Sequence, residues 1–442
     1  MKNLFYMMFC CVVIILTAAC KEDETEIITY DVNVSLVYPE GTSAKAGVLV
    51  SLTNNASTSY TTETSQEGIA SFKVPAGIYS VAASDKQSSH GASYVLNGTQ
   101  SNINIGSKAA NEIHLEMVAA KTNQLVIKEL YVGGCPKDDG SGNYQSDNYV
   151  IIYNNSDMPA EVSNLCLGYA LPFNSHASNK NYGEDGKLKY ESLGFQPAGY
   201  GIWYFQESLR LEPFSEVVVA ILGAIDHTQT YSQSVNLANK DYFCCYDPED
   251  WSSTSYYPTP YEGIPTNHYL LAEKWGMGTA WPLSKICPAF FLFTIEGVTP
   301  SQFAAAKDYF YDSDKVSDIN ACLKVKNEWV IDAVEVFTTT SATNTKRFTS
   351  AVDAGAVLMT NKQGYTVHRV VDLEATKAIE GNEALLVTGL TATPDESDGV
   401  VTCDPNGIDA KASAAKGAKI IYKDTNNSTN DFFERYQSSL RD

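Results

Sequence analysis

A stretch rich in tyrosine and tryptophan carries the clearest binding chemistry in this sequence. Within 40 residues, among several prolines, it places these aromatic side chains: Tyr242, Phe243, Tyr246, Trp251, Tyr256, Tyr257, Tyr261, Tyr269, Trp275 and Trp281. Flat aromatic faces can stack on sugar rings, large cofactors or peptides, and Tyr and Trp anchor interfaces with little loss of entropy. We predict ligand binding by six of them: Tyr242, Trp251, Tyr257, Tyr261, Trp275 and Trp281. The alternative is that they pack a long insertion against its domain, because long ordered loops need a small core of their own.

One histidine follows a carboxylate, an arrangement that suits general-base chemistry. Asp226 precedes His227 and could orient its imidazole, whereas a hydrogen-bonded loop histidine is the alternative. Spacing assigns no Ser or Cys partner, because the sequence lacks the G-x-S-x-G, H-E-x-x-H and G-x-x-x-x-G-K-[ST] motifs. We therefore predict that the chain is not an enzyme, and we assign it no catalytic residue and no cofactor.

Two loops rich in Asp, Asn and Gly could offer oxygen ligands to a hard cation such as calcium. They cover residues 137–148 and 403–409, and the second contains Asp404, Asn406 and Asp409. Neither reproduces the D-x-[DN]-x-[DN]-G spacing with its closing Glu. Since the same residues are ordinary turn formers, we predict Asx-rich turns and no metal site.

Composition and charge narrow the classes of partner. The chain has 442 residues, of which 44% are hydrophobic and 19% charged, as in a globular protein of two or three domains. Lys and Arg total 31 against 52 Asp and Glu, so the net charge is −21. Phosphate contacts need clustered Lys and Arg, which argues against binding to nucleic acid and against broad docking on an anionic membrane surface.

The cysteines indicate neither a zinc ribbon nor a thioredoxin-like site, because no C-x-x-C occurs. Apart from Cys10, Cys11 and Cys20 near the N-terminus, seven remain: Cys135, Cys166, Cys244, Cys245, Cys287, Cys322 and Cys403. Seven is an odd number, so at least one thiol is free or shared, and the pairing stays open.

The N-terminus has the pattern of an export signal. Lys2 precedes an almost wholly apolar run over residues 4–16, which is too short to span a bilayer, and Thr17-Ala18-Ala19-Cys20 follows. This segment resembles a bacterial lipoprotein signal with its lipobox, although Thr17 stands where the family has Leu, Val or Ile. The resemblance implies that residues 1–19 are removed and that Cys20 is lipidated, which anchors the chain without a transmembrane helix. An ordinary secretory signal with a structural Cys20 is the alternative.

An acidic tether is expected over residues 20–28. Lys21, Glu22, Asp23 and Glu24 open it, and such a charged run stays solvated and extended. The run resembles the export signal that sends Bacteroidota lipoproteins to the outer face of the outer membrane. The alternative is a linker that happens to be acidic.

Residues 29–118 predict a small β-sandwich. Val32, Val34 and Leu36 alternate with polar neighbours, which is the period of a half-buried strand. In EGIASFKVPAGIYSVAAS, residues 67–84, two alternating segments flank a Pro-Ala-Gly turn. This pattern resembles the carboxypeptidase regulatory-like (prealbumin-like) domain, which implies a non-catalytic spacer.

Residues 122–437 predict a second, larger β-sandwich. Its strand segments are expected at 125–134, 148–171, 201–221 and 330–337, and the chain ends in IIYKDTNNSTNDFFER, residues 420–435. The I-x-E-[IVL] start, the strand ending in N-x-[ST] and the terminal D-T-x-N-x-x-x-D-F resemble the lamin-tail immunoglobulin-like sandwich. Phe214 stands where that family usually has Gly in an L-x-P-G hairpin. We expect residues 225–345 to be an insertion, with one helix at 301–310 capped by Ser301.

With both domains in this order, the whole architecture of the chain is similar to a Bacteroidota lipoprotein family of unknown function. They imply an all-β chain anchored in the outer membrane and exposed at the cell surface. We expect a non-catalytic binding or accessory protein, with a TonB-dependent transporter as one candidate partner in nutrient capture. A glycan or small molecule is the expected ligand. The alternatives are an adhesive β-sandwich that binds glycan or matrix, and a hydrolase whose site has no known motif.

Overall fold

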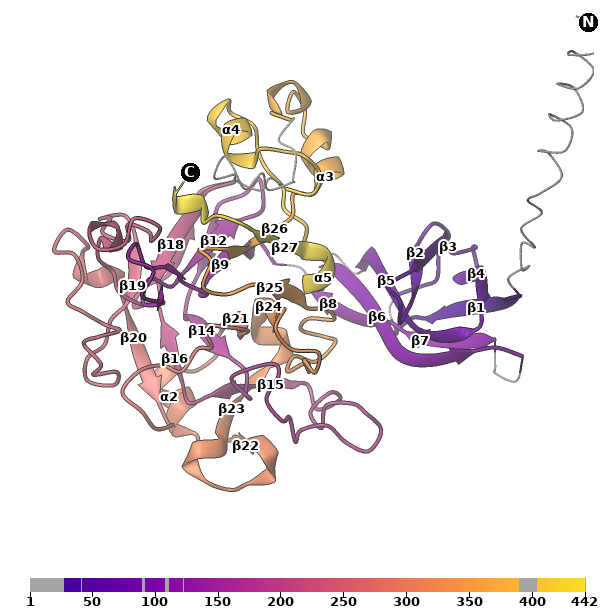
Figure 1. The fold of residues 1–442 in the computed structure, drawn as a ribbon, viewed down its shortest axis with the longest axis horizontal. Helices are drawn as coiled ribbons and strands as arrows, with labels where there is room; N and C mark the ends of the chain where they lie inside the picture. The colour runs from indigo at the N-terminus through magenta and orange to yellow at the C-terminus, as the bar shows by residue number, and fades with distance from the viewer. Residues whose placement is uncertain are drawn as a thin grey trace, which may run out of the picture. The chain divides into compact units, whose positions relative to one another are not determined.

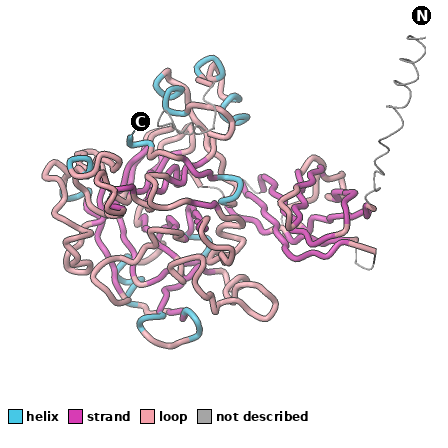
Figure 2. The backbone as a smooth tube through the Cα atoms, in the orientation of Figure 1, coloured by secondary structure: helices cyan, strands magenta, loops and turns pink. Residues whose placement is uncertain are grey.

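The fold is all-β, as the sequence predicts, and is built from β-sandwich domains. This computed structural model describes residues 28–40, 42–89, 92–107, 111–121, 123–388 and 404–441. Strands dominate it, and the helices are short (Figures 1 and 2). The expected signal peptide, lipidated Cys20, acidic tether and Cys403 lie outside the described residues. Among the described helices, none is long and apolar enough to cross a membrane.

The described chain divides into two compact units. The small unit holds residues 28–37, 44–82 and 100–115, and the large unit holds 38–43, 83–99 and 116–441. The N-terminal strands form two sheets. One has the order β4-β1-β7, with β1 Thr29–Val37, β4 Ile69–Pro75 and β7 Glu112–Glu116. The other has the order β3-β2-β5-β6-β8, with β2 Leu49–Asn54, β3 Ser59–Glu63, β5 Gly77–Ser89, β6 Ala92–Ile105 and β8 Val118–Lys121.

The small unit confirms the alternation predicted for its strands. Val32 and Val34 are buried and lie opposite Phe72 and Ala70 in the antiparallel register of β1 and β4. The Pro-Ala-Gly turn separates β4 from β5 as expected. The hydroxyl of Tyr79 donates to the carbonyl of Pro75 at 2.9 Å and fixes this turn.

A single twelve-stranded sheet dominates the large unit. Its order is β25-β24-β21-β14-β16-β20-β19-β18-β12-β9-β26-β27. In chain order the strands are β9 Leu125–Tyr131, β12 Tyr149–Asn154, β14 Leu165–Tyr169, β16 Gly201–Tyr204, β18 Glu216–Ala220, β19 Phe243–Cys245, β20 Tyr269–Lys274, β21 Ala289–Thr294, β24 Val330–Thr338, β25 Val357–Met359, β26 Thr366–Arg369 and β27 Phe432–Arg435. The edge strands β25 and β27 lie against each other, so the sheet curls around its core.

The remaining elements are short. Three small sheets pair β10 Cys135–Pro136 with β11 Asn143–Tyr144, β13 Ala160–Val162 with β17 Leu209–Leu211, and β23 Ala321–Lys326 with both β15 Phe195–Gly199 and β22 Tyr309–Tyr311. The α-helices are α2 Pro300–Ala305, α3 Leu373–Ala378, α4 Ala410–Ala415 and α5 Ser428–Asp431. The 3₁₀ turns are His227–Gln229, Thr266–His268, Asp312–Asp314, Asp318–Asn320, Asn327–Trp329, Glu383–Leu385 and Ser439–Arg441.

The expected insertion at 225–345 is integral to the large sheet. Residues 225–345 contribute four inner strands to the twelve-stranded sheet, namely β19, β20, β21 and β24. Strand β19 joins two parallel pairings, with β18 and with β20. All but the last residue of β21 are buried. These segments therefore supply part of the core of the large unit.

The helix expected at 301–310 is shorter and begins earlier. Helix α2 starts at Pro300, and Thr299 caps it by accepting from the backbone N–H of Gln302 while the Gln302 side chain accepts from Thr299. The predicted cap, Ser301, is therefore wrong, because Thr299 with Gln302 forms a complete capping box and Pro300 suits the first helical position. The aromatic segment Tyr309–Tyr311 forms strand β22 beside β23 instead.

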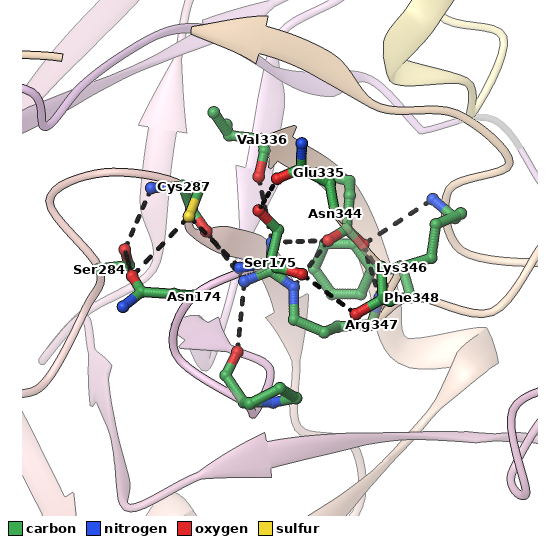
Figure 3. A network of polar contacts seen from close by, with 12 residues as sticks. Asn174, Ser175, Ser284, Cys287, Glu335, Val336, Asn344, Lys346, Arg347 and Phe348 are labelled. Carbon is green, nitrogen blue, oxygen red and sulfur yellow. Dashed lines mark hydrogen bonds and ion pairs between the residues drawn. The ribbon is translucent and has the colours of Figure 1, made fainter. Parts of the chain in front are cut away.

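Two fully buried arginines hold the large unit together. Arg347 meets the Glu335 carboxylate with Nε at 2.7 Å and Nη2 at 2.6 Å, and its other donors reach the carbonyls of Pro172, Phe173, Cys287 and Val336 (Figure 3). Arg369 on β26 pairs with Asp332 on β24 and donates to the carbonyls of Ile127 and Lys423. Because β24 and β26 lie next to opposite edges of the sheet, Arg369 fastens its two ends.

The terminal D-T-x-N-x-x-x-D-F motif surrounds Arg369, the second of these buried arginines. Asp431 accepts from Thr425 and from the backbone of Asn427, and one of its oxygens lies 3.8 Å from Arg369. The ring of Phe432 lies 4.3 Å from the Arg369 guanidinium carbon. The motif is therefore a structural device in this chain.

Candidate functional site

Most of the predicted ligand-binding aromatics pack in the core or against it. Trp251 is 0% exposed, and Tyr257 and Trp281 are also buried in the main core of the large unit. Trp281 donates from its backbone to the Tyr257 hydroxyl at 3.1 Å and from its indole to the carbonyl of Gly201 at 2.8 Å. These contacts fit the packing alternative for the three buried side chains.

The other three predicted aromatics do not gather around one cavity. Trp275 is half-buried and packs against the hydrophobic cluster that includes residues of β21 and β23. Tyr261 is 44% exposed. Tyr242 is half-buried and lines the larger cavity described below. Ligand binding by Tyr242 stays a prediction that this location favours.

His227 is a buried, doubly hydrogen-bonded loop residue. Its Nε2 donates to the carbonyl of Gly223 at 2.6 Å, and its Nδ1 accepts from the Tyr144 hydroxyl at 2.8 Å. Burial lowers its pKa, so the ring is neutral at pH 7. Asp226 does not orient this ring by hydrogen bonding, because its carboxylate accepts from Thr228 and Gln229 and caps a 3₁₀ turn.

The acidic loops form turns and caps. Asp139 accepts from the backbone of Ser141, and Asp138 accepts from Ser232. Asp404 accepts from the backbone of Asn406, and Asp409 caps α4. Within the residues that the structure describes, no group of three or more His, Cys, Asp or Glu side chains is placed to hold a metal ion. The six described cysteines beyond the N-terminus are buried free thiols.

A large cavity lies elsewhere, on the outer face of the large sheet. Its volume is about 1100 Å³, slightly above the roughly 300–1,000 Å³ that is typical of small-molecule sites. Strands β9, β12, β18, β26 and β27 form its floor, and α4 with the segment before it forms a wall. Aromatic and charged side chains share the lining: Lys128, Tyr153, Phe214, Glu216, Tyr242, His368, Asp404, Asp409, Lys411, Tyr422, Phe433 and Arg435.

A β-bulge supplies the central cation of this cavity. The register of β9 with β12 pairs Ile151 with Glu129 and Ile152 with Ile127, so Lys128 is the extra residue between them. Bulges re-aim side chains and are common beside active sites. The Lys128 ammonium lies 2.5 Å from a Glu216 carboxylate oxygen and 5.9 Å from the centre of the Tyr422 ring. Burial alone would lower the pKa of Lys128, but Tyr422 and Glu216 raise it above its usual value, so Lys128 is charged.

His368 presents a neutral imidazole to the same cavity. Its Nδ1 lies 2.9 Å from the carbonyl of Arg369, so Nδ1 carries the proton and Nε2 is an acceptor. Nε2 is 4.0 Å from a carboxylate oxygen of the buried Glu129. Burial, and then the positive charges of Lys128 and Arg435, lower the pKa of His368 to about 3.

Phe214 projects into the cavity from a strained turn. Residues Glu212–Ser215 form a turn closed by the Ser215 N–H to Glu212 carbonyl bond of 3.2 Å, with Pro213 at its second position. Phe214, at the third position, has φ of 56°, the left-handed region where glycine is favoured. Such a conformation costs a bulky residue about 1–2 kcal/mol. The aromatic ring is thus present where the backbone prefers no side chain.

Most of these cavity residues carry no sequence signal that marks them as part of a site. Phe214 departs from the glycine expected in the hairpin, and that departure is the signal available for the turn. Lys128 and His368 come from strands about 240 positions apart, which pair as β9 and β26. No local spacing predicts that pairing.

The fold and cavity define an all-β protein with a mixed aromatic and charged pocket on its larger unit. A family model described as "Protein of unknown function (DUF4876)" matches residues 212–384, which begin at the Phe214 turn. A crystal structure of a DUF4876 family protein from Bacteroides thetaiotaomicron is 20% identical and has a TM-score of 0.48, with 91% of this chain and 94% of that chain covered. The search of curated proteins finds no match. The match to the family model fits the expectation of a family of unknown function, and the assignment of the two domains to known domain families stays a prediction.

Proposed function

We propose that this chain is a lipid-anchored, cell-surface protein of the outer membrane that binds a small ligand in the Lys128 cavity without transforming it. The observation that carries the proposal is the cavity itself, with Phe214 held in a left-handed conformation at its rim. Strained residues persist where the surrounding structure requires them, and they cluster at ligand clamps. An aromatic wall and a few converging polar groups are typical of binding pockets.

The polar groups of the cavity suit recognition. Lys128 is neutralised by Glu216, and His368 is held by the backbone of Arg369. Both can still present hydrogen-bonding atoms to a ligand, since the ammonium has three donors and the imidazole Nε2 is an acceptor. The expected glycan or small-molecule ligand would therefore find both stacking surfaces and hydrogen-bond partners.

A thermal-shift screen of the full chain in detergent tests ligand binding. The probes are monosaccharides, oligosaccharides, peptides and amino acids. We expect at least one class to raise the unfolding midpoint of the wild-type chain, with the rise lost in Phe214→Gly. A ligand whose shift survives both Phe214→Gly and Lys128→Met would contradict binding in this cavity.

Membrane anchoring is tested separately. Cys20→Ser should release the chain from membranes, because each buried lipid methylene contributes about 0.8 kcal/mol to anchoring. Persistent membrane association of Cys20→Ser at high salt would contradict the lipoprotein assignment.

Replacing Glu22, Asp23, Glu24 and Glu26 by Ala tests the export signal. These changes should reduce the access of added protease to the chain while leaving the anchor intact, whereas unchanged access would count against the export signal.

The accessory role is proposed from the predicted location. A pull-down of the tagged chain from gently solubilised outer membranes, followed by mass spectrometry, examines it. Recovery of one stoichiometric TonB-dependent transporter supports the role. Reproducible recovery of no partner favours a free-standing surface binder.

A further inference from the structure

A second cavity adjoins the first one at Glu216. Its volume is about 500 Å³, and its lining includes Glu207, Arg210, Glu216, Asp241, Phe243 and His268. Glu216 lines both cavities. The consecutive residues Tyr242 and Phe243 line one cavity each. Because they share Glu216, the first residue of β18, the two spaces lie next to each other at that end of the strand.

The second cavity also offers a flat aromatic surface. The rings of Phe243 and His268 are stacked, with centroids 4.1 Å apart and planes inclined by 12°. The backbone carbonyl of Tyr242 lies 3.1 Å from His268 Nδ1 and helps to hold the imidazole in this position. The Phe243 ring also packs on Phe205, with ring centroids 5.0 Å apart, so the outer face of His268 is the surface left for the apolar face of a sugar ring.

Carboxylates surround this aromatic pair. Glu207 and Asp241 are exposed, and Glu216 stands between the cavities. The one arginine of the lining, Arg210, is 2.9 Å from Glu161. Carboxylates accept strong hydrogen bonds from hydroxyl groups. They repel anions, and the whole chain carries a net charge of −21.

We propose that the two cavities are adjoining subsites for a neutral oligosaccharide. Some of its sugar units occupy the Lys128 cavity against Phe214. The oligosaccharide then passes Glu216, and a further unit packs on the Phe243–His268 pair with hydroxyls donated to Asp241 and Glu207. This assignment rests on the proposed ligand-binding function and names the class and extent of the ligand.

A calorimetric length series tests the proposal with the full chain in detergent. The probes are neutral gluco-, manno-, galacto- and xylo-oligosaccharides, each from monosaccharide to hexasaccharide, with acidic oligosaccharides and short peptides as competing classes. We expect affinity to rise roughly tenfold or more once the oligomer reaches the second cavity. Asp241→Ala, an exposed position, and His268→Ala should each remove most of that gain. Neither should change the affinity for short sugars, whereas Phe214→Gly should weaken binding at every length.

The outcomes separate this proposal from the one it rests on. Binding that does not grow with length, or long-chain binding unchanged in both Asp241→Ala and His268→Ala, overturns the second subsite and leaves the first cavity as a binding site. Preference for acidic oligosaccharides or peptides overturns the assignment to neutral sugars. Binding of no probe by the wild-type chain contradicts the proposed function together with this inference.

Discussion

Two regions of the large unit handle charge in opposite ways. The first is the buried ion pair of Arg347 and Glu335, which we call the Arg347 clasp. Every guanidinium donor of Arg347 has a protein acceptor there, and both side chains are fully buried. In the Lys128 cavity, the ion pair is partly open, with the Lys128 and Glu216 side chains 15% and 38% exposed. The clasp has no unpaired donor for a ligand, whereas the charged groups of the cavity are still accessible to one. We therefore assign the fully paired, buried charges of Arg347 and Glu335 to stability, and the partly exposed charges beside Phe214 to the proposed ligand binding.

Breaking the clasp should produce the largest change in stability. Arg347→Met removes the guanidinium partner of the buried Glu335 carboxylate and leaves it only the Lys346 ammonium 3.8 Å away, so the free energy of unfolding should fall by about 3–5 kcal/mol. Urea denaturation followed by tryptophan fluorescence measures it. Lys128→Met is the matched control, because the Glu216 carboxylate that it leaves behind is 38% exposed and stays in contact with water, so the loss should be smaller, about 1–2 kcal/mol. Equal losses in the two variants would contradict the distinction between the regions.

Acidic pH should weaken the fold through His368. Its pKa is about 3 in the folded chain against an ordinary value of 6.5, so the unfolded chain binds the extra proton between these values. Stability from this group is therefore present above pH 6.5 and is lost as pH falls toward 3. Between pH 6.5 and 4.5 the loss should be roughly 2–3 kcal/mol.

The variant His368→Gln isolates that effect from the other groups around the ring, namely Lys128, Arg435, Glu129, Glu216 and Tyr422. Denaturation midpoints measured across the same pH range should show a flatter slope for the variant. Parallel slopes would mean that His368 is not the group responsible.

The smallest stability change and the clearest binding change are expected at Phe214. Phe214→Gly relieves the left-handed backbone strain while removing a half-buried ring, so the free energy of unfolding should change by less than about 1 kcal/mol. Ligand affinity should fall at least roughly tenfold. Tyr261→Ala removes an aromatic side chain that lines neither cavity and should leave both quantities unchanged. A loss of stability without a loss of affinity in Phe214→Gly would reduce Phe214 to a packing residue.

The sequence predicts the strands well where their pattern is local. Alternation at Val32 and Val34, the strand near 330–337 and the strand that ends at the N-x-[ST] motif all appear in the structure. For the aromatic run of 242–281, the sequence does not separate ligand stacking from core packing, because both use the same residue types; Trp251 is packed in the core. The cavity escapes prediction since it depends on the β9 bulge and on a long-range strand pairing.

Hydrogen exchange of the full chain with and without a saturating neutral oligosaccharide tests the central claim most directly. Binding in the Lys128 cavity predicts slower exchange at the Glu212–Ser215 turn and in α4, with little change in the loop that carries Tyr261. Slower exchange confined to residues 251–281, with no change at the turn or in α4, would contradict binding in the Lys128 cavity. It would indicate that the ligand binds to the aromatic residues of 242–281 instead.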